Sequence, residues 1–212
     1  MAECVSPLCG AVRPDFRLSG RPTLILASAS PRRQALLAEL GVVFSVRPSH
    51  IPEEHPPIAP AQAITAVALD KARAVARALG PEPVRVVLGA DTEVVLDGAL
   101  LGKPRDAADA ARMLRALRGR SHEVITGVAL VASGPDAREE ATAVTTRVTM
   151  RHYTDEELEA YVATGEPLDK AGAYAVQGLG RWLVGAVDGC FTNVVGLPVS
   201  TTRQLLERWR VV

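Results

Sequence analysis

The sequence predicts an α/β fold, built from a mixed and twisted sheet with flanking helices. Short apolar runs with the character of buried strands alternate with longer segments whose apolar residues recur at helical spacing. The pair Asp97-Gly98 lies between two of the apolar runs and is typical of a type I′ hairpin turn, so part of the sheet is expected to be antiparallel. The 212 residues are enough to bury a substantial core in one compact unit.

The first half of the chain begins with an irregular segment and then turns abruptly into strand and helix signals. Residues 1–20 show no apolar period and are predicted to be a poorly ordered N-terminal extension, which leaves 21–212 as the folded domain. Residues 23–27 form a short apolar run, and Ser30 followed by Pro31 is a helix-start signal. The other elements expected in this half are a helix to about residue 40, a strand over 42–47, a proline-rich loop over 48–60, a helix over 61–79, a strand over 84–88 and a hairpin over 94–101.

The second half continues the alternation of helices and strands. Asp106 is predicted to cap one helix, and Thr154 with Glu157 forms a capping-box pattern that opens another. The elements expected here are helices over 107–117, 155–163 and 200–209 and strands over 123–132, 141–152 and 182–187. Between 165 and 180 the sequence is polar and rich in glycine and predicts no regular element, which inside a compact domain is typical of a functional segment.

The composition excludes several classes of function. The formal net charge is zero, so no global basic field favours duplex nucleic acid as a partner. We expect a cytoplasmic protein with no membrane partner, because no apolar stretch is long enough to span a bilayer and the first residues lack a secretory pattern. Three cysteines cannot all pair, which fits a reducing compartment. The scattered histidines are expected to be surface or structural groups rather than zinc ligands: His50, His55, His122 and His152.

The start of the first predicted helix carries two cations where the helix dipole disfavours them. Arg32 and Arg33 lie in the opening turn, beside the backbone N–H groups that have no partner within the helix. A bound phosphate would turn this conflict into a binding site, and Ser28 and Ser30 add hydroxyl donors. The segment is therefore a candidate anion site, although a solvated basic turn would show the same residues.

Asp91 is the candidate for acid–base or metal chemistry. It follows the expected strand over 84–88, and the ends of strands are where α/β folds place ligands. A carboxylate there can bind a metal, accept a proton or simply cap a turn. Glu93 interrupts the apolar residues that follow, and its side chain is a candidate to face the same cleft.

Lysine is rare in this chain. Lys71, Lys103 and Lys170 are the only lysines among 24 basic residues. Where arginine is so strongly favoured, a retained lysine indicates a position that requires a compact ammonium, such as the surroundings of phosphate oxygens, unless it has been retained by chance. With Arg32 and Arg33 these lysines could supply about as many cations as a triphosphate and a divalent metal would use for positioning and charge neutralisation.

Four segments resemble, in the same order, the signature blocks of the Maf family. They are LILASASPRRQALLAELGV, LGADTEVVLDGALLGKPRDAADAARMLRALRGRSHEVITGVAL, YVATGEPLDKAGAYAVQGLG and NVVGLP, and they cover nearly everything from Thr23 onward. The resemblance implies a nucleoside triphosphate pyrophosphatase that cuts between the α- and β-phosphates. Its expected fold is similar to the inosine triphosphate pyrophosphatases, with two lobes around a cleft. The resemblance further implies a divalent cation, Mg²⁺ or Mn²⁺, and a homodimer.

The resemblance also assigns roles to single residues of this chain. Asp91 becomes the proton acceptor that activates water, and Glu53 with Asp91 becomes a pair of metal ligands. The residues that would hold the phosphates are Ser28, Arg32, Arg33, Lys71, Lys103 and Lys170. In the branch of the family that prefers dTTP and UTP, base selection is associated with the positions of Arg32, Thr92 and Gln177. The branch that acts on 7-methyl-GTP has an extra aromatic residue between the proline and the arginines of the first block, and this chain lacks it.

Two other functions also fit the sequence. One is a purine-selective or house-cleaning pyrophosphatase that acts on modified nucleotides, and the other is a non-catalytic nucleotide-binding regulator of cell division. Asp91 and Glu53 favour catalysis, because a pure binding protein needs no carboxylate to activate water. Glu93 departs from the family pattern, in which an apolar residue is usual at this position.

Overall fold

The computed structural model describes residues 22–80, 83–134 and 138–212 of the chain. The extension predicted for residues 1–20 lies outside the described residues and stays a prediction. The strands are β1 (Thr23–Leu26), β2 (Phe44–Val46), β3 (Arg85–Leu96), β4 (Ala99–Leu100), β5 (Ser121–Ala132), β6 (Glu139–Met150) and β7 (Val184–Asp188). The helices are α1 (Pro31–Ala38), α2 (Pro60–Leu79), α3 (Ala107–Leu117), α4 (Asp155–Ala163), α5 (Phe191–Val195) and α6 (Val199–Arg208), with short 3₁₀ helices η1 (Glu166–Asp169), η2 (Ala171–Ala173) and η3 (Gly178–Leu183).

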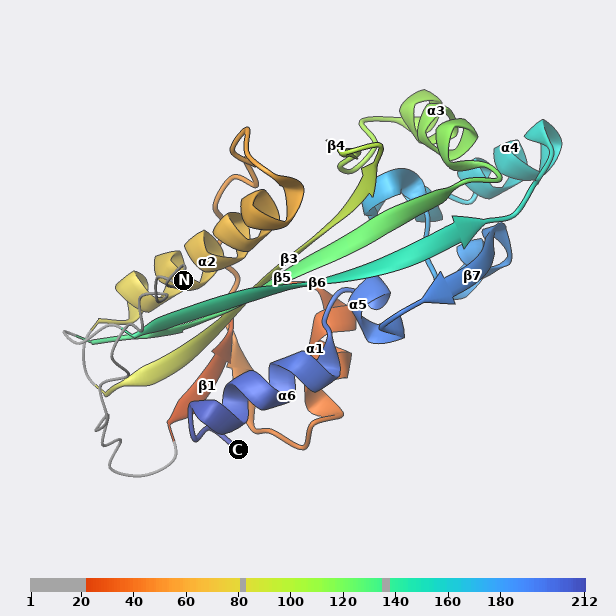
Figure 1. Cartoon of the computed structure of the whole chain (residues 1–212). Coiled ribbons are helices and arrows are strands. Elements are labelled where there is room, and N and C mark those ends of the chain that lie inside the picture. Colours follow the sequence, from red (N-terminus) through yellow and green to blue (C-terminus); the bar gives the residue numbers. More distant parts are fainter. Residues whose placement is uncertain (1–21, 81–82, 135–137) are drawn as a thin grey trace, which may run out of the picture.

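The strands join one mixed sheet, which confirms the predicted fold class (Figure 1). Their order is β2-β1-β3-β5-β6-β7, and the short β4 pairs with the end of β3. The strand β1 is parallel to β2 and β3, and the other pairs are antiparallel. Asp97 and Gly98, between β3 and β4, have φ angles of 52° and 79°, as the predicted type I′ turn requires.

The prediction that a strand ends near Gly89 is wrong, because β3 continues through this position as one long strand (Figure 1). Its register with β5 is unbroken from Val86 to Val95, so Asp91 lies in the middle of a strand rather than at its end. Gly89 has a packing role instead: a Cβ atom there would lie 2.1 Å from the backbone oxygen of Ala68 on α2. The glycine thus permits a close approach of helix and sheet.

The two largest hydrophobic clusters among the described residues lie along the sheet and form the cores of the two expected lobes. The first core joins α1 and α6 to one face of the sheet half that contains β1, and α2 packs on the opposite face of that half (Figure 1). The second core joins α3 and α4 to the far ends of β3, β5 and β6. Ala90 belongs to the first core and Val94 to the second. Asp91, between them, is therefore placed where the two lobes meet.

The helices begin where the capping signals predict. Ser30 and Asp106 each accept a hydrogen bond from the backbone N–H three residues further on, and Thr154 with Glu157 forms the two bonds of a capping box. The stretch over 165–180 differs from the expectation, since it contains η1, η2 and the start of η3. Among the helices in the described ranges, none combines the length and the apolar character that crossing a membrane requires.

Candidate functional site

The predicted site residues come together at one pocket between the two lobes. Its volume is about 620 Å³, which is ordinary for a site that binds a small molecule. The walls come from the start of α1, the middle of β3, the η1–η3 stretch and the end of α5. The predicted residues that line it are Ser28, Arg32, Arg33, Glu53, Asp91, Thr92, Lys103, Lys170 and Gln177. The remaining one, Lys71, is buried next to this wall, against Asp91 and Glu53.

Asp91 is a buried carboxylate held by two opposing partners. It is 3% exposed, and its side chain points to one face of β3. Lys71 donates to Oδ1 over 2.7 Å, and Nε2 of His55 lies 2.8 Å from Oδ2. Burial by itself would raise the pKa of Asp91, but the hydrogen bond from His55 and the charge of Lys71 outweigh it and lower the pKa to about 2. Asp91 is therefore an ionised acceptor at neutral pH.

Glu53 extends this cluster from the loop between β2 and α2. Its two oxygens accept from different ammonium groups, over 2.6 Å from Lys71 and 3.3 Å from Lys103. Partial burial would raise the pKa of Glu53, but the hydrogen bond and the charge of Lys71 overcome this effect and lower it. Lys71 thus joins the two predicted metal ligands, Glu53 and Asp91. Lys103 has a side chain that is 55% exposed, so it can turn toward an incoming anion.

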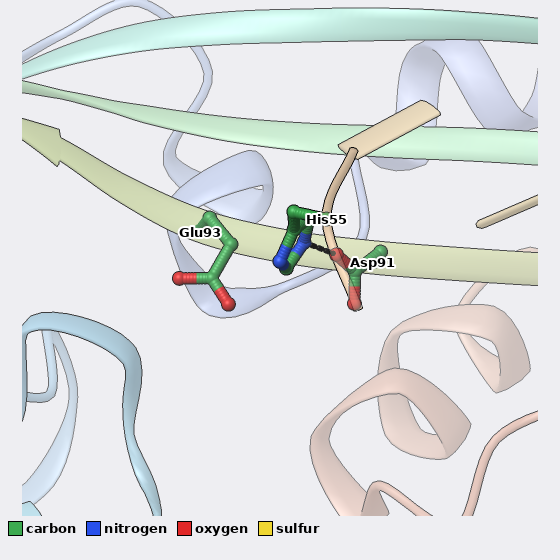
Figure 2. A group of neighbouring side chains, drawn as sticks. All are labelled: His55, Asp91 and Glu93. Carbon is green, nitrogen blue, oxygen red and sulfur yellow. Dashed lines mark hydrogen bonds and ion pairs between the residues drawn. The ribbon is translucent and has the colours of Figure 1, made fainter. Parts of the chain in front are cut away.

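His55 is a residue of the site that the sequence did not indicate. It was expected to be a surface or structural histidine, yet it lies against Asp91 in the site (Figure 2). Its hydrogen bond to Asp91 raises its pKa, against the opposing effect of burial. The irregular loop that carries His55 has no periodicity, so nothing in the sequence signalled which way the ring would point.

Glu93 lies on the same face of β3 as Asp91, because residues two apart in a strand point to the same side (Figure 2). The side chain is 6% exposed, and its Oε2 atom has no hydrogen-bond partner among the residues that the structure describes. Burial, followed by the charge of Asp91, raises the pKa of Glu93 to about 7. The polar residue that interrupts an apolar run is thus a buried carboxyl group at the site.

Replacing Glu93 by leucine should therefore stabilise the metal-free protein more at pH 8 than at pH 5. The folded pKa of about 7 exceeds the ordinary 4.5, so the unfolded chain loses this proton first as pH rises, and stability falls between the two values. The complete loss in the free energy of unfolding, reached above pH 7, is on the order of 3 kcal/mol. Thermal melts in chelator across this pH range measure the effect, with the exposed Glu123→Leu as the control. A difference in Tm that does not grow with pH would contradict it.

Arg33 forms one wall of the pocket together with the start of α1. Its guanidinium donates to the carbonyl of Gly196 over 2.9 Å, to Oγ1 of Thr92 over 3.0 Å and to Oγ of Ser28 over 3.3 Å. These bonds tie α1, β3 and the turn after α5 together. The first turn of α1 contains no acidic residue, so its positive end and Arg33 give this corner of the pocket an electrostatic preference for anions.

The remaining predicted contacts lie on the outer rim. The side chain of Arg32 is 40% exposed, and its NH1 atom lies 3.9 Å from the carboxylate of Asp169. Lys170 donates to the same carboxylate over 2.6 Å and to the carbonyl of Glu166 over 2.8 Å. Gln177 is exposed in the segment that precedes η3. Arg32 and Lys170 therefore form a cationic rim around Asp169, with Gln177 on the same side of the pocket.

The chain resembles known proteins in both sequence and fold. A family model described as Maf-like protein matches residues 23–209. The chain is 54% identical over 184 residues to the dTTP/UTP pyrophosphatase of Moorella thermoacetica, covering 86% of this chain and 93% of that protein. It is 52% identical over 187 residues to the dTTP/UTP pyrophosphatase of Syntrophotalea carbinolica, covering 87% and 84% respectively. A HAM1 protein from Coxiella burnetii has the same fold, with a TM-score of 0.51, 15% identity and coverage of 88% of this chain and 99% of that one. The chain belongs to the Maf-like protein family.

Proposed function

We propose that this chain hydrolyses dTTP and UTP between the α- and β-phosphates and releases a nucleoside monophosphate and pyrophosphate. The names of its relatives at about 50% identity support this substrate choice. The observation that carries the reaction type is the position of Asp91, an ionised carboxylate in a pocket that four cations also line, namely Arg32, Arg33, Lys103 and Lys170. Such a pocket attracts a polyphosphate and contains a group that can take a proton from water.

Asp91 would accept the proton of the attacking water. Lys71 and His55 hold its two oxygens in place, so little reorganisation is needed when the substrate binds. The negative charge of bound phosphates would raise the pKa of Asp91, which makes it a stronger base in the complex than in the free protein. Water adds across the α–β anhydride as the bond to pyrophosphate breaks, and the proton on Asp91 then passes to solvent.

The cations around the pocket would hold the three phosphates. Arg33 and the start of α1 form the inner anion corner, and Ser28 adds its hydroxyl there. Lys103, Arg32 and Lys170 lie along the outer part of the pocket, and each has a carboxylate partner that a phosphate oxygen could replace. The side chains of Lys103 and Arg32 are the more exposed of the three. Lys71 is buried between carboxylates, so we assign it mainly to positioning Asp91.

A divalent cation, Mg²⁺ or Mn²⁺, is part of the proposed reaction. The residues fit such an ion, since Glu53 and Asp91 offer ionised oxygens on one wall and Glu93 adds a buried oxygen that has no partner in the described ranges. Glu53 and Asp91 would hold it. When bound, the ion would neutralise charge on the phosphate oxygens and make phosphorus easier to attack.

The base would be selected on the side of the pocket formed by Gln177, Arg32 and Thr92. Uracil and thymine present two carbonyl acceptors on either side of one N–H donor, and an amide can both donate and accept. The hydroxyl of Thr92 is already engaged, 3.0 Å from Arg33 and 2.9 Å from Thr126. Gln177 and Arg32 are therefore the more available groups for reading the base.

The wild-type chain should hydrolyse dTTP and UTP faster than ATP, GTP or 7-methyl-GTP, and Gln177→Ala should erode this preference. Loss of one hydrogen bond to a buried base costs about 1–3 kcal/mol, or roughly one to two decades in kcat/KM for the pyrimidines, with a much smaller change for poor substrates. The panel is measured as kcat/KM with Mg²⁺ or Mn²⁺, and Gln204→Ala, on the exposed face of α6, is the matched control. A preference for a purine or methylated nucleotide, or an equal loss on every base, would overturn this assignment.

We also propose a homodimer in the cytoplasm. The likeness to the Maf family supports the dimer, and the odd number of cysteines fits a reducing compartment. Sedimentation equilibrium tests the oligomeric state, and an apparent mass of one chain at micromolar concentration would remove the dimer from this account.

A further inference from the structure

We propose that His55, Asp91 and Glu93 form a binding site for a transition-metal dication, and that this site takes Mn²⁺ in preference to Mg²⁺ before any nucleotide is bound. The use of the ion in catalysis rests on the proposed function, but its binding does not. His55 and Glu93 would thereby add a nitrogen and a second buried carboxylate to the oxygen donors of the pocket.

The three side chains converge from two parts of the chain. Asp91 and Glu93 alternate along β3 and share one face of it, and the loop between β2 and α2 brings the ring of His55 between them (Figure 2). One possible ligand atom from each residue lies within 4.8 Å of the others. Opposite ligands of an octahedral ion are about 4.2 Å apart at metal–ligand distances of about 2.1 Å, so only small side-chain movements are needed.

Glu93 supplies an independent sign that the cluster has a ligand. The residue is only 6% exposed, and Oε2 has no hydrogen-bond partner among the described residues. A buried carboxylate oxygen without a partner is costly, whereas a cation beside it would satisfy it. The apolar residues around it in β3 make a polar group here otherwise unfavourable.

The cations of the pocket have other partners and leave this side of Asp91 open. Lys71 contacts Oδ1 of Asp91, the oxygen opposite the one that faces His55. Arg33 donates to a backbone carbonyl and to two hydroxyl groups. Lys103 has a mostly exposed ammonium that contacts Glu53. An added dication between His55 and Glu93 would therefore meet two carboxylates on its own side before it meets an ammonium group.

The donor set determines which ion is favoured. Mg²⁺ prefers oxygen ligands and keeps several of its waters, while transition-metal dications accept imidazole nitrogen readily. Mn²⁺ is the weakest binder of the first-row transition series, so a preference for Mn²⁺ over Mg²⁺ is a stringent test. It also has little affinity for thiolates compared with softer ions, so Cys190 should not compete.

The test is a titration of the untagged, nucleotide-free chain with Mn²⁺, read by electron paramagnetic resonance. We expect one tightly bound ion, nitrogen modulation in the spin-echo signal from a coordinated imidazole, and displacement by Mg²⁺ only at concentrations at least about tenfold higher. His55→Gln should abolish the nitrogen signal, and Glu93→Gln should weaken Mn²⁺ binding by at least about tenfold. The exposed residues His152 and Glu123 provide the matched controls His152→Gln and Glu123→Gln, which should bind as wild type does.

Three results would overturn the site: equal affinity for the two ions, a bound ion without nitrogen modulation, or nitrogen modulation that survives His55→Gln. If Glu93→Gln does not fold, Glu93→Leu replaces it, since leucine suits the apolar surroundings of β3. If protein that hydrolyses dTTP showed no imidazole-bound Mn²⁺ in the Mn²⁺ titration, this site would be rejected and the proposed function would stand. An imidazole-bound Mn²⁺ without hydrolysis of any triphosphate would do the reverse.

Discussion

Asp91→Asn should lower kcat for dTTP by at least about 10²-fold, and by up to about 10⁴-fold, while the protein stays folded. An amide cannot take a proton from water and is a poorer ligand than a carboxylate for a hard cation. The side chain keeps its shape, and its amide oxygen can still accept the hydrogen bond from Lys71. The loss should therefore appear in activity far more than in structure.

The matched control for this variant is Asp97→Asn. Asp97 is an exposed carboxylate in the β3–β4 turn, and asparagine tolerates its positive φ of 52°. Steady-state kinetics and a thermal melt of both variants make the comparison. If Asp91→Asn retained more than about a tenth of the wild-type kcat, Asp91 could not be the proton acceptor.

Lys71→Met should destabilise the protein by about 3–5 kcal/mol and also impair activity. Lys71 is 4% exposed, and its ammonium donates to Asp91 over 2.7 Å and to Glu53 over 2.6 Å. Methionine is of similar length but leaves the two carboxylates facing each other without a shared cation. The two carboxylates could both stay ionised only at the cost of strong repulsion, so the pKa of at least one carboxyl group should rise.

Lys103→Met separates this effect from a general loss of positive charge in the pocket. Lys103 also contacts Glu53, but over 3.3 Å and with a side chain that is 55% exposed, so its removal should cost at most about 1 kcal/mol. Chemical denaturation of the two variants gives the comparison. Equal stability losses would show that the buried position of Lys71 carries no special weight.

Local signals in the sequence were sufficient for most of the fold. Ser30, Asp106 and Thr154 cap helices because their side chains satisfy backbone N–H groups, an interaction that depends only on near neighbours. The Asp97-Gly98 turn is local for the same reason. The length of β3 could not be predicted in this way. Gly89 indicates a strand end when it is considered alone, and only the packing of α2 against it explains a glycine inside a continuous strand.

The candidate site was likewise predictable only where the signals in the sequence are local. The cations and Asp91 stood out as residue types in unusual places, and the structure collects nine of the ten predicted residues around one pocket. Glu93 could be suspected from alternation in a strand, since it lies two residues after Asp91. His55 could not, because it reaches Asp91 from an irregular loop 36 residues earlier in the chain. Contacts of that kind depend on tertiary packing, which local sequence patterns do not predict.

The most direct test of the central claim is the identity of the products formed from UTP and dTTP by the full-length chain with Mg²⁺ or Mn²⁺, followed by phosphorus-31 nuclear magnetic resonance. Cleavage at the α–β anhydride predicts the nucleoside monophosphate and pyrophosphate in equal amounts from the first time point, with both products lost in Asp91→Asn. Formation of the nucleoside diphosphate and orthophosphate would contradict this account, and so would an unchanged nucleotide under conditions in which the protein is folded and metal is present.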